Sequence, residues 1–120
     1  MYVNVYQHSY TYDLNRNVEI DTHTSSSFEG KIVTERTRNK DLDLSQTVYD
    51  AEDNAVSVTT YKHIPIPNNG YIVGLERVER PADGSWEQWE YDYNFETNMR
   101  TVTYTNSEGM NDVFEEKFYY

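Results

Sequence analysis

The chain has 120 residues, enough for one domain with one hydrophobic core, and it carries a formal net charge of −11. Its twelve tyrosines and two tryptophans separate it from disordered acidic chains, which lack the large apolar side chains needed to offset the entropy of ordering. A charge of this sign repels nucleic acid and anionic lipid, so we expect neither direct nucleic-acid binding nor membrane association.

The absence of cysteine excludes disulfides and thiol chemistry, and suits a reducing compartment. The first residues, Met1 to His8, show neither the basic nor the apolar segment of a signal peptide. No apolar run approaches the roughly 20 residues that a membrane helix needs. We therefore expect a cytoplasmic protein.

Alternation of large and polar side chains with period two is typical of β-strands and recurs in several segments. In chain order these segments are residues 2–12, 28–36, 71–80, 85–93, 99–105 and 113–120. They are separated by polar turn signals at 15–17, 65–70, 81–84 and 106–109, and by a polar run at 22–27 that we expect to be a loop. Short strands joined by polar turns predict a single all-β domain over 1–120, arranged as an antiparallel meander, sandwich or small barrel.

One segment departs from this pattern. Leu44, Val48, Ala51 and Ala55 follow helical spacing after Asp43, which predicts one short helix near 43–54 as the exception to the strands.

A weak internal repeat joins a Tyr-Asp pair to an asparagine that precedes a β-prone run. Its copies are Tyr12-Asp13 with Asn17, Tyr49-Asp50 with Asn54, and Tyr91-Asp92 with Asn98, the last carrying two extra residues. The copies start 37 and 42 residues apart. We interpret each as a strand ending in Tyr-Asp, a turn closed by Asn, and a return strand.

This layout resembles the Tyr-Asp (YD, or Rhs) repeats of large secreted shell proteins. The stretch from Gly74 to Asp92 carries the resemblance best, through Arg77-Val78, Pro81, Asp83-Gly84 and Tyr91-Asp92. It implies a local hairpin in this chain. The encapsulating function is not implied, because the family's repeats recur about every twenty residues and its shells are many times longer.

Catalytic and metal-binding motifs are absent. His8, His23 and His63 lack metal-ligand spacing, and there is no nucleophile elbow or phosphate-binding glycine loop. Acidic pairs occur by chance among twenty-one carboxylates and decide nothing. We therefore predict a protein that is not an enzyme and holds no cofactor or metal.

One stretch has part of the ligand pattern of a calcium-binding loop. Positions 1, 3, 5, 7 and 12 of an EF-hand-like loop would be Asp41, Asp43, Ser45, Thr47 and Glu52. Gln46 stands where the sharp turn needs glycine, and the flanking residues are β-prone, which favours a solvated loop or a helix start.

The acidic excess is concentrated in residues 81–120, where nine acidic and two basic residues give a net charge of −7. Carboxylates on alternate positions of adjacent strands can approach the charge density of duplex DNA. We expect these acids and the neighbouring rings to form one contiguous partner-binding patch. Its predicted residues are Trp86, Glu87, Trp89, Glu90, Tyr91, Asp92, Tyr93, Glu115 and Glu116.

The sequence hypothesis is a binding protein that inhibits an enzyme by occupying its basic nucleic-acid-binding surface. The expected partner is a basic protein such as a nuclease or a CRISPR effector. In composition the chain resembles small phage-encoded inhibitors, including anti-CRISPR proteins, and immunity proteins that neutralise nuclease toxins. Two alternatives stay open: a β domain that binds glycans or small molecules through its Tyr and Trp rings, and a structural assembly module built from Tyr-Asp hairpins. The sequence does not determine the oligomeric state.

Overall fold

The computed structural model describes residues 6–25, 28–38, 42–67 and 70–119, and these residues form nine β-strands and no helix. The strands are β1 (Tyr6–Asp13), β2 (Val18–Ser25), β3 (Phe28–Thr37), β4 (Asp43–Tyr49), β5 (Ala55–Pro65), β6 (Tyr71–Arg80), β7 (Ser85–Asn94), β8 (Met99–Asn106) and β9 (Asn111–Lys117). The predicted all-β class is confirmed.

Two local predictions are wrong. The expected helix near 43–54 is strand β4 followed by a tight turn, because Leu44 and Val48 also satisfy the period of a strand paired on both sides. The polar run at 22–27 is not wholly a loop, since residues 22–25 continue β2. Residues 26–27 lie outside the described part of the chain.

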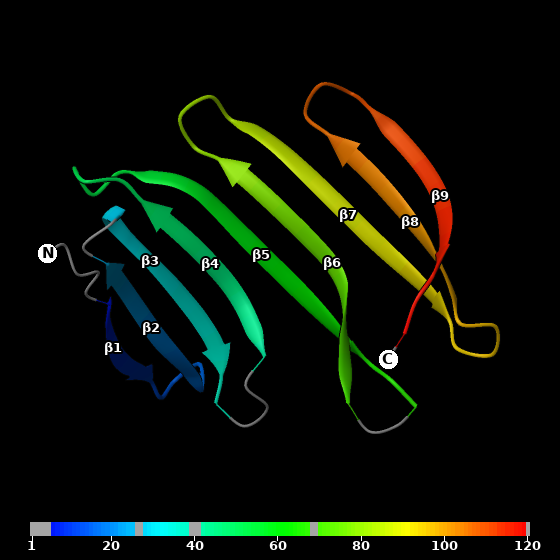
Figure 1. The fold of residues 1–120 in the computed structure, drawn as a ribbon, viewed down its shortest axis with the longest axis horizontal. Helices are drawn as coiled ribbons and strands as arrows, with labels where there is room; N and C mark the ends of the chain where they lie inside the picture. Colours follow the sequence, from blue (N-terminus) through cyan, green and yellow to red (C-terminus); the bar gives the residue numbers. More distant parts are fainter. Residues whose placement is uncertain (1–5, 26–27, 39–41, 68–69, 120) are drawn as a thin grey trace, which may run out of the picture.

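The nine strands form one antiparallel sheet whose spatial order follows the sequence from β1 to β9. Of the three predicted architectures, the meander is the one observed. Figure 1 shows the strands side by side in a twisted sheet that stays open, with β1 and β9 as its two edges. The Cα radius of gyration is 17.1 Å, against about 13.6 Å expected for a compact domain of 120 residues.

Two hairpins share a four-residue turn that is set by an Asp or Asn side chain. Asp13 Oδ1 accepts the backbone N–H groups of Asn15 and Arg16, and Asn94 Oδ1 accepts those of the residues two and three positions later. Each turn ends on an asparagine with a φ of 56°, Asn17 or Asn98. Asparagine tolerates this left-handed conformation better than most residues, which explains why it closes both turns.

The Tyr-Asp repeat is therefore present as hairpins, but its third copy was misaligned. The turn between β7 and β8 begins at Tyr93-Asn94, two residues beyond the predicted Tyr91-Asp92, and needs no insertion. In the second copy the left-handed residue is Asp53, with a φ of 68°, and Asn54 follows it. The predicted hairpin from Gly74 to Asp92 is present as β6 and β7.

Few side chains are fully enclosed in this sheet. Among the described residues the buried hydrophobic side chains are Val18, Val102 and Phe118, and the buried polar ones are Asp21 and Thr34. No second layer covers either face of the described sheet (Figure 1). Most strand residues are therefore half-buried, and both faces remain available for contact.

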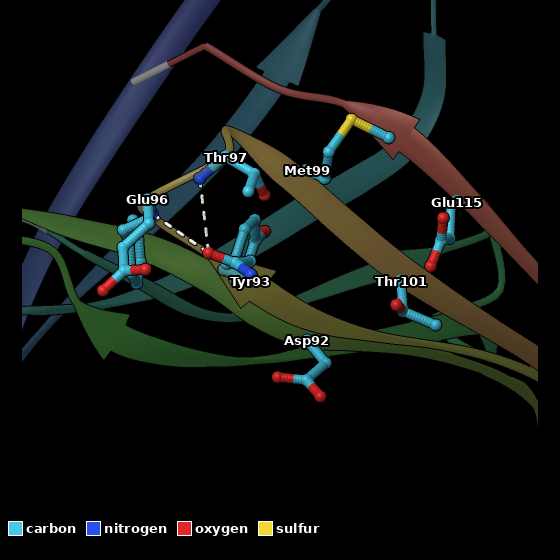
Figure 2. A pocket seen from close by; sticks show the side chains of 9 residues that line it. Asp92, Tyr93, Glu96, Thr97, Met99, Thr101 and Glu115 are labelled. Atoms are coloured by element: carbon cyan, nitrogen blue, oxygen red, sulfur yellow. Dashed lines mark hydrogen bonds between the residues drawn. The ribbon is translucent and has the colours of Figure 1, made fainter.

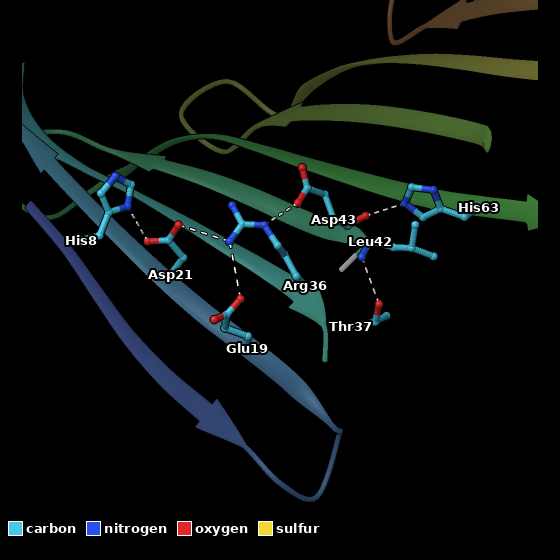
Figure 3. A network of polar contacts seen from close by, with 8 residues as sticks. All are labelled: His8, Glu19, Asp21, Arg36, Thr37, Leu42, Asp43 and His63. Atoms are coloured by element: carbon cyan, nitrogen blue, oxygen red, sulfur yellow. Dashed lines mark hydrogen bonds and ion pairs between the residues drawn. The ribbon is translucent and has the colours of Figure 1, made fainter. Parts of the chain in front are cut away.

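A polar network crosses the N-terminal half of the sheet (Figure 3). Arg36 lies at its centre, with Nε 2.8 Å from Asp43 Oδ1 and Nη1 3.2 Å from Asp21 Oδ2. Asp21 also accepts from His8 Nδ1 at 2.9 Å. Burial alone would raise the pKa of Asp21, but the bonds from His8 and Arg36 lower it below its ordinary value. Charged hydrogen bonds thus link β1 to β4 where apolar packing is thin.

Candidate acidic binding site

Strand β7 contains seven of the nine predicted binding residues, and successive side chains along a strand point to opposite faces. Directly paired residues of antiparallel neighbours share a face, so the register assigns each one. Asp92 pairs with Thr101, which pairs with Glu115. Tyr91 pairs with Val102 on the other side. The predicted patch is therefore divided between two faces.

We name the two faces of β7–β9 by their commonest side chains. The threonine face consists of Trp86, Gln88, Glu90, Asp92, Asn94, Met99, Thr101, Thr103, Thr105, Asn111, Val113, Glu115 and Lys117. The aromatic face consists of Ser85, Glu87, Trp89, Tyr91, Tyr93, Arg100, Val102, Tyr104, Asn106, Asp112, Phe114 and Glu116. The expectation of one contiguous patch combining all nine predicted residues is wrong, because residues adjacent in sequence point in opposite directions.

On the aromatic face the predicted acids have cationic or hydroxyl partners. Glu116 Oε1 lies 2.6 Å from Nε of Arg100. Glu87 contacts Nη2 of Arg80 at 3.1 Å and accepts from the Tyr104 hydroxyl at 3.2 Å. These two carboxylates are compensated within the chain.

The rings of the aromatic face also pack against one another. The Arg100 guanidinium lies 4.5 Å from the centre of the Tyr91 ring, and Trp89 packs against Tyr104 with centroids 5.3 Å apart. Tyr93 donates its hydroxyl to the Val73 carbonyl oxygen at 2.6 Å. Burial raises the pKa values of both Tyr91 and Tyr93, although Arg100 opposes the shift. These rings stabilise the sheet.

The threonine face contains two open hollows that share Asp92 and Thr101 in their walls. The larger, about 830 Å³, lies at the end of β7. Its walls are Asp92, Tyr93, Asn94, Phe95, Glu96, Thr97, Met99, Thr101 and Glu115. The smaller, about 450 Å³, extends over β5 and β6. Its walls are Lys62, Ile64, Gly74, Leu75, Glu90, Tyr91, Asp92, Thr101 and Thr103. We call the two neighbouring hollows together the acidic trough.

Four exposed carboxylates border the acidic trough: Glu90, Asp92, Glu96 and Glu115. Figure 2 shows three of them around the larger hollow, from β7, from the following turn and from β9. None of the four forms an ion pair with another described residue, although Glu90 accepts a hydrogen bond from Gln88 at 3.3 Å. The trough therefore combines threonine hydroxyls and one cation, Lys62, with four carboxylates that form no ion pair within the described residues.

Of the predicted residues, Glu90, Asp92 and Glu115 are brought together here. Trp86 shares this face, but the Arg77 guanidinium lies 4.2 Å from its ring centre and covers it. Glu96 and the threonines of the trough were missed. Glu96 could have been found by placing the third repeat at Asn94, which puts this residue in the turn beside Asp92.

The described residues contain no group of three or more His, Cys, Asp or Glu side chains that could hold a metal ion. Of the EF-hand-like stretch from Asp41 to Glu52, Asp41 lies outside the described residues. Asp43, Ser45 and Thr47 lie on strand β4, and Glu52 lies in the following turn. This geometry is not that of an EF-hand loop.

Comparison with known proteins gives no match to any family model, curated protein or solved structure. Across 6–25, 28–38, 42–67 and 70–119, the structure has no helix that is long and apolar enough to span a membrane.

Proposed function

We propose that this chain is a non-enzymatic binding protein whose acidic trough binds a cationic segment of a protein partner. The observation that carries the proposal is an asymmetry between carboxylates. Glu90, Asp92, Glu96 and Glu115 border the two hollows and form no ion pair with another described residue. On the opposite face, Arg80 pairs with Glu87 and Arg100 pairs with Glu116, which leaves Asp112 as an acid without an ion pair among the described residues. Lysine or arginine side chains would supply the missing charge.

The partner class that fits is the basic nucleic-acid-binding surface of an enzyme. Glu90 and Asp92 are two residues apart on one strand, a separation of roughly 6.8 Å, and Asp92 and Glu115 are two strands apart, roughly 9.6 Å. Negative charges repeated at such intervals across an exposed sheet face can substitute for backbone phosphates at a cationic surface. The chain's net charge of −11 would also speed encounter with such a surface.

The geometry supports binding better than catalysis or glycan recognition. The trough carboxylates are exposed, whereas acid–base sites depend on burial to tune a carboxyl group. Glycan binding needs free aromatic faces, and of the predicted site rings Tyr91 and Trp86 each have one face packed against an arginine side chain. An inhibitor acting by occupancy needs only the charged surface.

The test uses a fluorescein-labelled peptide of alternating arginine and glycine, titrated with the protein and followed by fluorescence anisotropy. Removing three trough charges (Glu90→Gln, Asp92→Asn, Glu115→Gln) should weaken binding about tenfold, because three exposed ion pairs are worth about 0.5 kcal/mol each. Raising salt should weaken wild-type binding. The wild-type protein should also displace a labelled DNA duplex from the same peptide.

A matched control removes the same charge from elsewhere on the sheet (Glu52→Gln, Glu108→Gln, Asp112→Asn). These acids are exposed and lie outside the trough. The control should change the affinity less than about twofold. Equal weakening by both triple variants would refute a localised site and leave net charge as the explanation.

A further inference from the structure

The two edges of the sheet differ in how they are protected against pairing with another strand. Edge strand β9 carries Asp112, Glu115, Glu116 and Lys117 among its seven residues. Charged side chains on an edge discourage addition of a further strand. Edge strand β1 has no lysine, arginine or glutamate, and its single aspartate, Asp13, is its last residue.

Within the described residues, other features of β1 also leave this edge without protection. It contains no proline, and its eight residues pair with β2 without a register shift, so no bulge interrupts it. Tyr10 and Tyr12 are 51% and 56% exposed, although tyrosine in a sheet gains most from a neighbouring strand. A tyrosine-rich edge without a bulge, whose one charged residue is its last, is a template for strand addition.

We propose that β1 pairs antiparallel with β1 of a second copy, about a two-fold axis at Tyr10, to give a dimer with one continuous sheet. In this register Tyr10 faces its own counterpart, Ser9 faces Thr11, His8 faces Tyr12 and Gln7 faces Asp13. No like charges oppose each other. Facing tyrosines stabilise a sheet, and the Gln7 amide can donate to the Asp13 carboxylate.

The same arrangement is unfavourable at β9. A two-fold axis at Phe114 would place Asp112 opposite Glu116 twice, and an axis at Glu115 would place that residue opposite itself. Like charges directly opposite each other destabilise a strand pair. An axis at Val113 would avoid such pairs, but the four charged side chains of β9 discourage addition of any strand there, so β1 is the edge that we expect a second copy to occupy.

The dimer and the acidic trough are independent. The trough lies over β5–β9, whereas β1 is at the other end of the strand order (Figure 1). Because each copy carries −11, repulsion opposes dimer formation and added salt should strengthen it. Binding of a cationic peptide at the trough should respond to salt in the opposite direction, so failure of either proposal can be recognised separately.

Sedimentation velocity tests the dimer over protein concentrations from about 5 to about 500 µM, because an edge-to-edge contact is smaller than a standard interface and should be weak. The wild-type protein should shift from monomer toward dimer, more strongly at about 500 mM than at about 50 mM NaCl. Tyr10→Lys should abolish the shift. Val113→Lys makes the same kind of change on the β9 edge, at a residue that is 63% exposed, and should leave it intact.

Cysteine cross-linking tests the register, since the chain has no cysteine of its own. Oxidised Tyr10→Cys should form a covalent dimer, because residues on the axis of an antiparallel pair lie within disulfide reach. Val113→Cys should cross-link much less. This measurement also decides the matter if circular dichroism shows that Tyr10→Lys does not fold.

Three results would overturn the proposal. The first is a wild-type monomer at every concentration and salt level. The second is loss of the dimer in Val113→Lys, which would indicate pairing through β9 or head-to-tail pairing of β1 with β9. The third is equal cross-linking of the two cysteine variants.

Discussion

Phe118 is the largest of the buried hydrophobic side chains, and its truncation tests how far this sheet depends on one aromatic cluster. The residue is 5% exposed, and its ring meets Tyr93 and Phe95 edge-on, with centroid distances of 4.9 and 5.7 Å. Its backbone N–H also donates to the Asn98 carbonyl oxygen, which anchors the chain after β9 to the β7–β8 turn. Phe118 thus joins the two last hairpins.

Phe118→Ala should lower the free energy of unfolding by about 3 kcal/mol. Fully enclosed Phe→Ala replacements cost about 3–5 kcal/mol, and each lost edge-to-face pair accounts for about 0.5–1.5 kcal/mol. We expect the lower end because the cluster lies at one end of an uncovered sheet, where neighbouring rings can move into the space. This loss is a large fraction of the roughly 5–15 kcal/mol typical of small domains.

Urea unfolding followed by circular dichroism measures this loss, and the neighbouring residue supplies the control. Tyr119 is 90% exposed, so Tyr119→Ala should change stability by less than about 0.5 kcal/mol. A loss below about 1 kcal/mol for Phe118→Ala, or equal losses in the two variants, would refute the cluster as a stabilising core.

Further predictions concern backbone strain, pH and a buried hydroxyl. Gly30→Ala should lower the free energy of unfolding by at least about 3 kcal/mol, because the added Cβ would overlap a β4 carbonyl oxygen at a φ of 141°. Gly84 has a φ of 73° and open space around it, so Gly84→Ala should cost only about 1 kcal/mol. Urea unfolding compares the two variants, and equal losses of stability would exclude the overlap. Because the pKa of Asp21 is lowered in the folded protein, its ionised carboxylate stabilises the fold. This contribution is fully present above the pKa of the unfolded chain, about 3.9, and is lost as the pH falls through the lower pKa of the folded state. The Asp21→Asn variant should therefore be less stable than the wild type at neutral pH, and it should lose less stability when the pH falls below about 4. Parallel profiles of stability against pH for the two proteins would contradict this. Tyr93→Phe should lower the free energy of unfolding by about 1 kcal/mol in thermal or urea unfolding, because it removes a hydrogen bond. Tyr91→Phe should be close to neutral, since the Tyr91 hydroxyl has no hydrogen bond within the described residues.

The fold class could be predicted from the sequence because side-chain alternation and turn residues act locally. Trp89, Tyr91 and Tyr93 alternate with polar residues, and Asp83-Gly84 indicates a turn, so the hairpin of β6 and β7 was foreseeable. The strand at 43–49 was not, because its apolar residues satisfy helical and strand spacing equally well. The choice of an open meander over a sandwich or barrel depends on pairing between distant strands, which local patterns do not encode.

The candidate site could be predicted only in part for a related reason. The acidic excess near the C-terminus was visible, and Glu90, Asp92 and Glu115 do lie on one face. Which acids lack a cationic partner was not visible, because that depends on register. Arg100 pairs with Glu116, which is 16 residues away in the sequence. If the pairing of β8 with its neighbours shifted by one residue, the Arg100 side chain would point to the other face of the sheet.

Within the part of the chain that the structure describes, each strand contacts only the strands immediately before and after it. Such connectivity makes stability close to a sum of nearest-neighbour terms, as in solenoid arrays. The edge strands can then unfold locally while the central strands stay paired. Because the contacts are largely local in sequence, the sheet should also fold rapidly, one hairpin after another. Hydrogen exchange should consequently be slowest in the middle strands, with cooperativity weaker than in a globule of equal length.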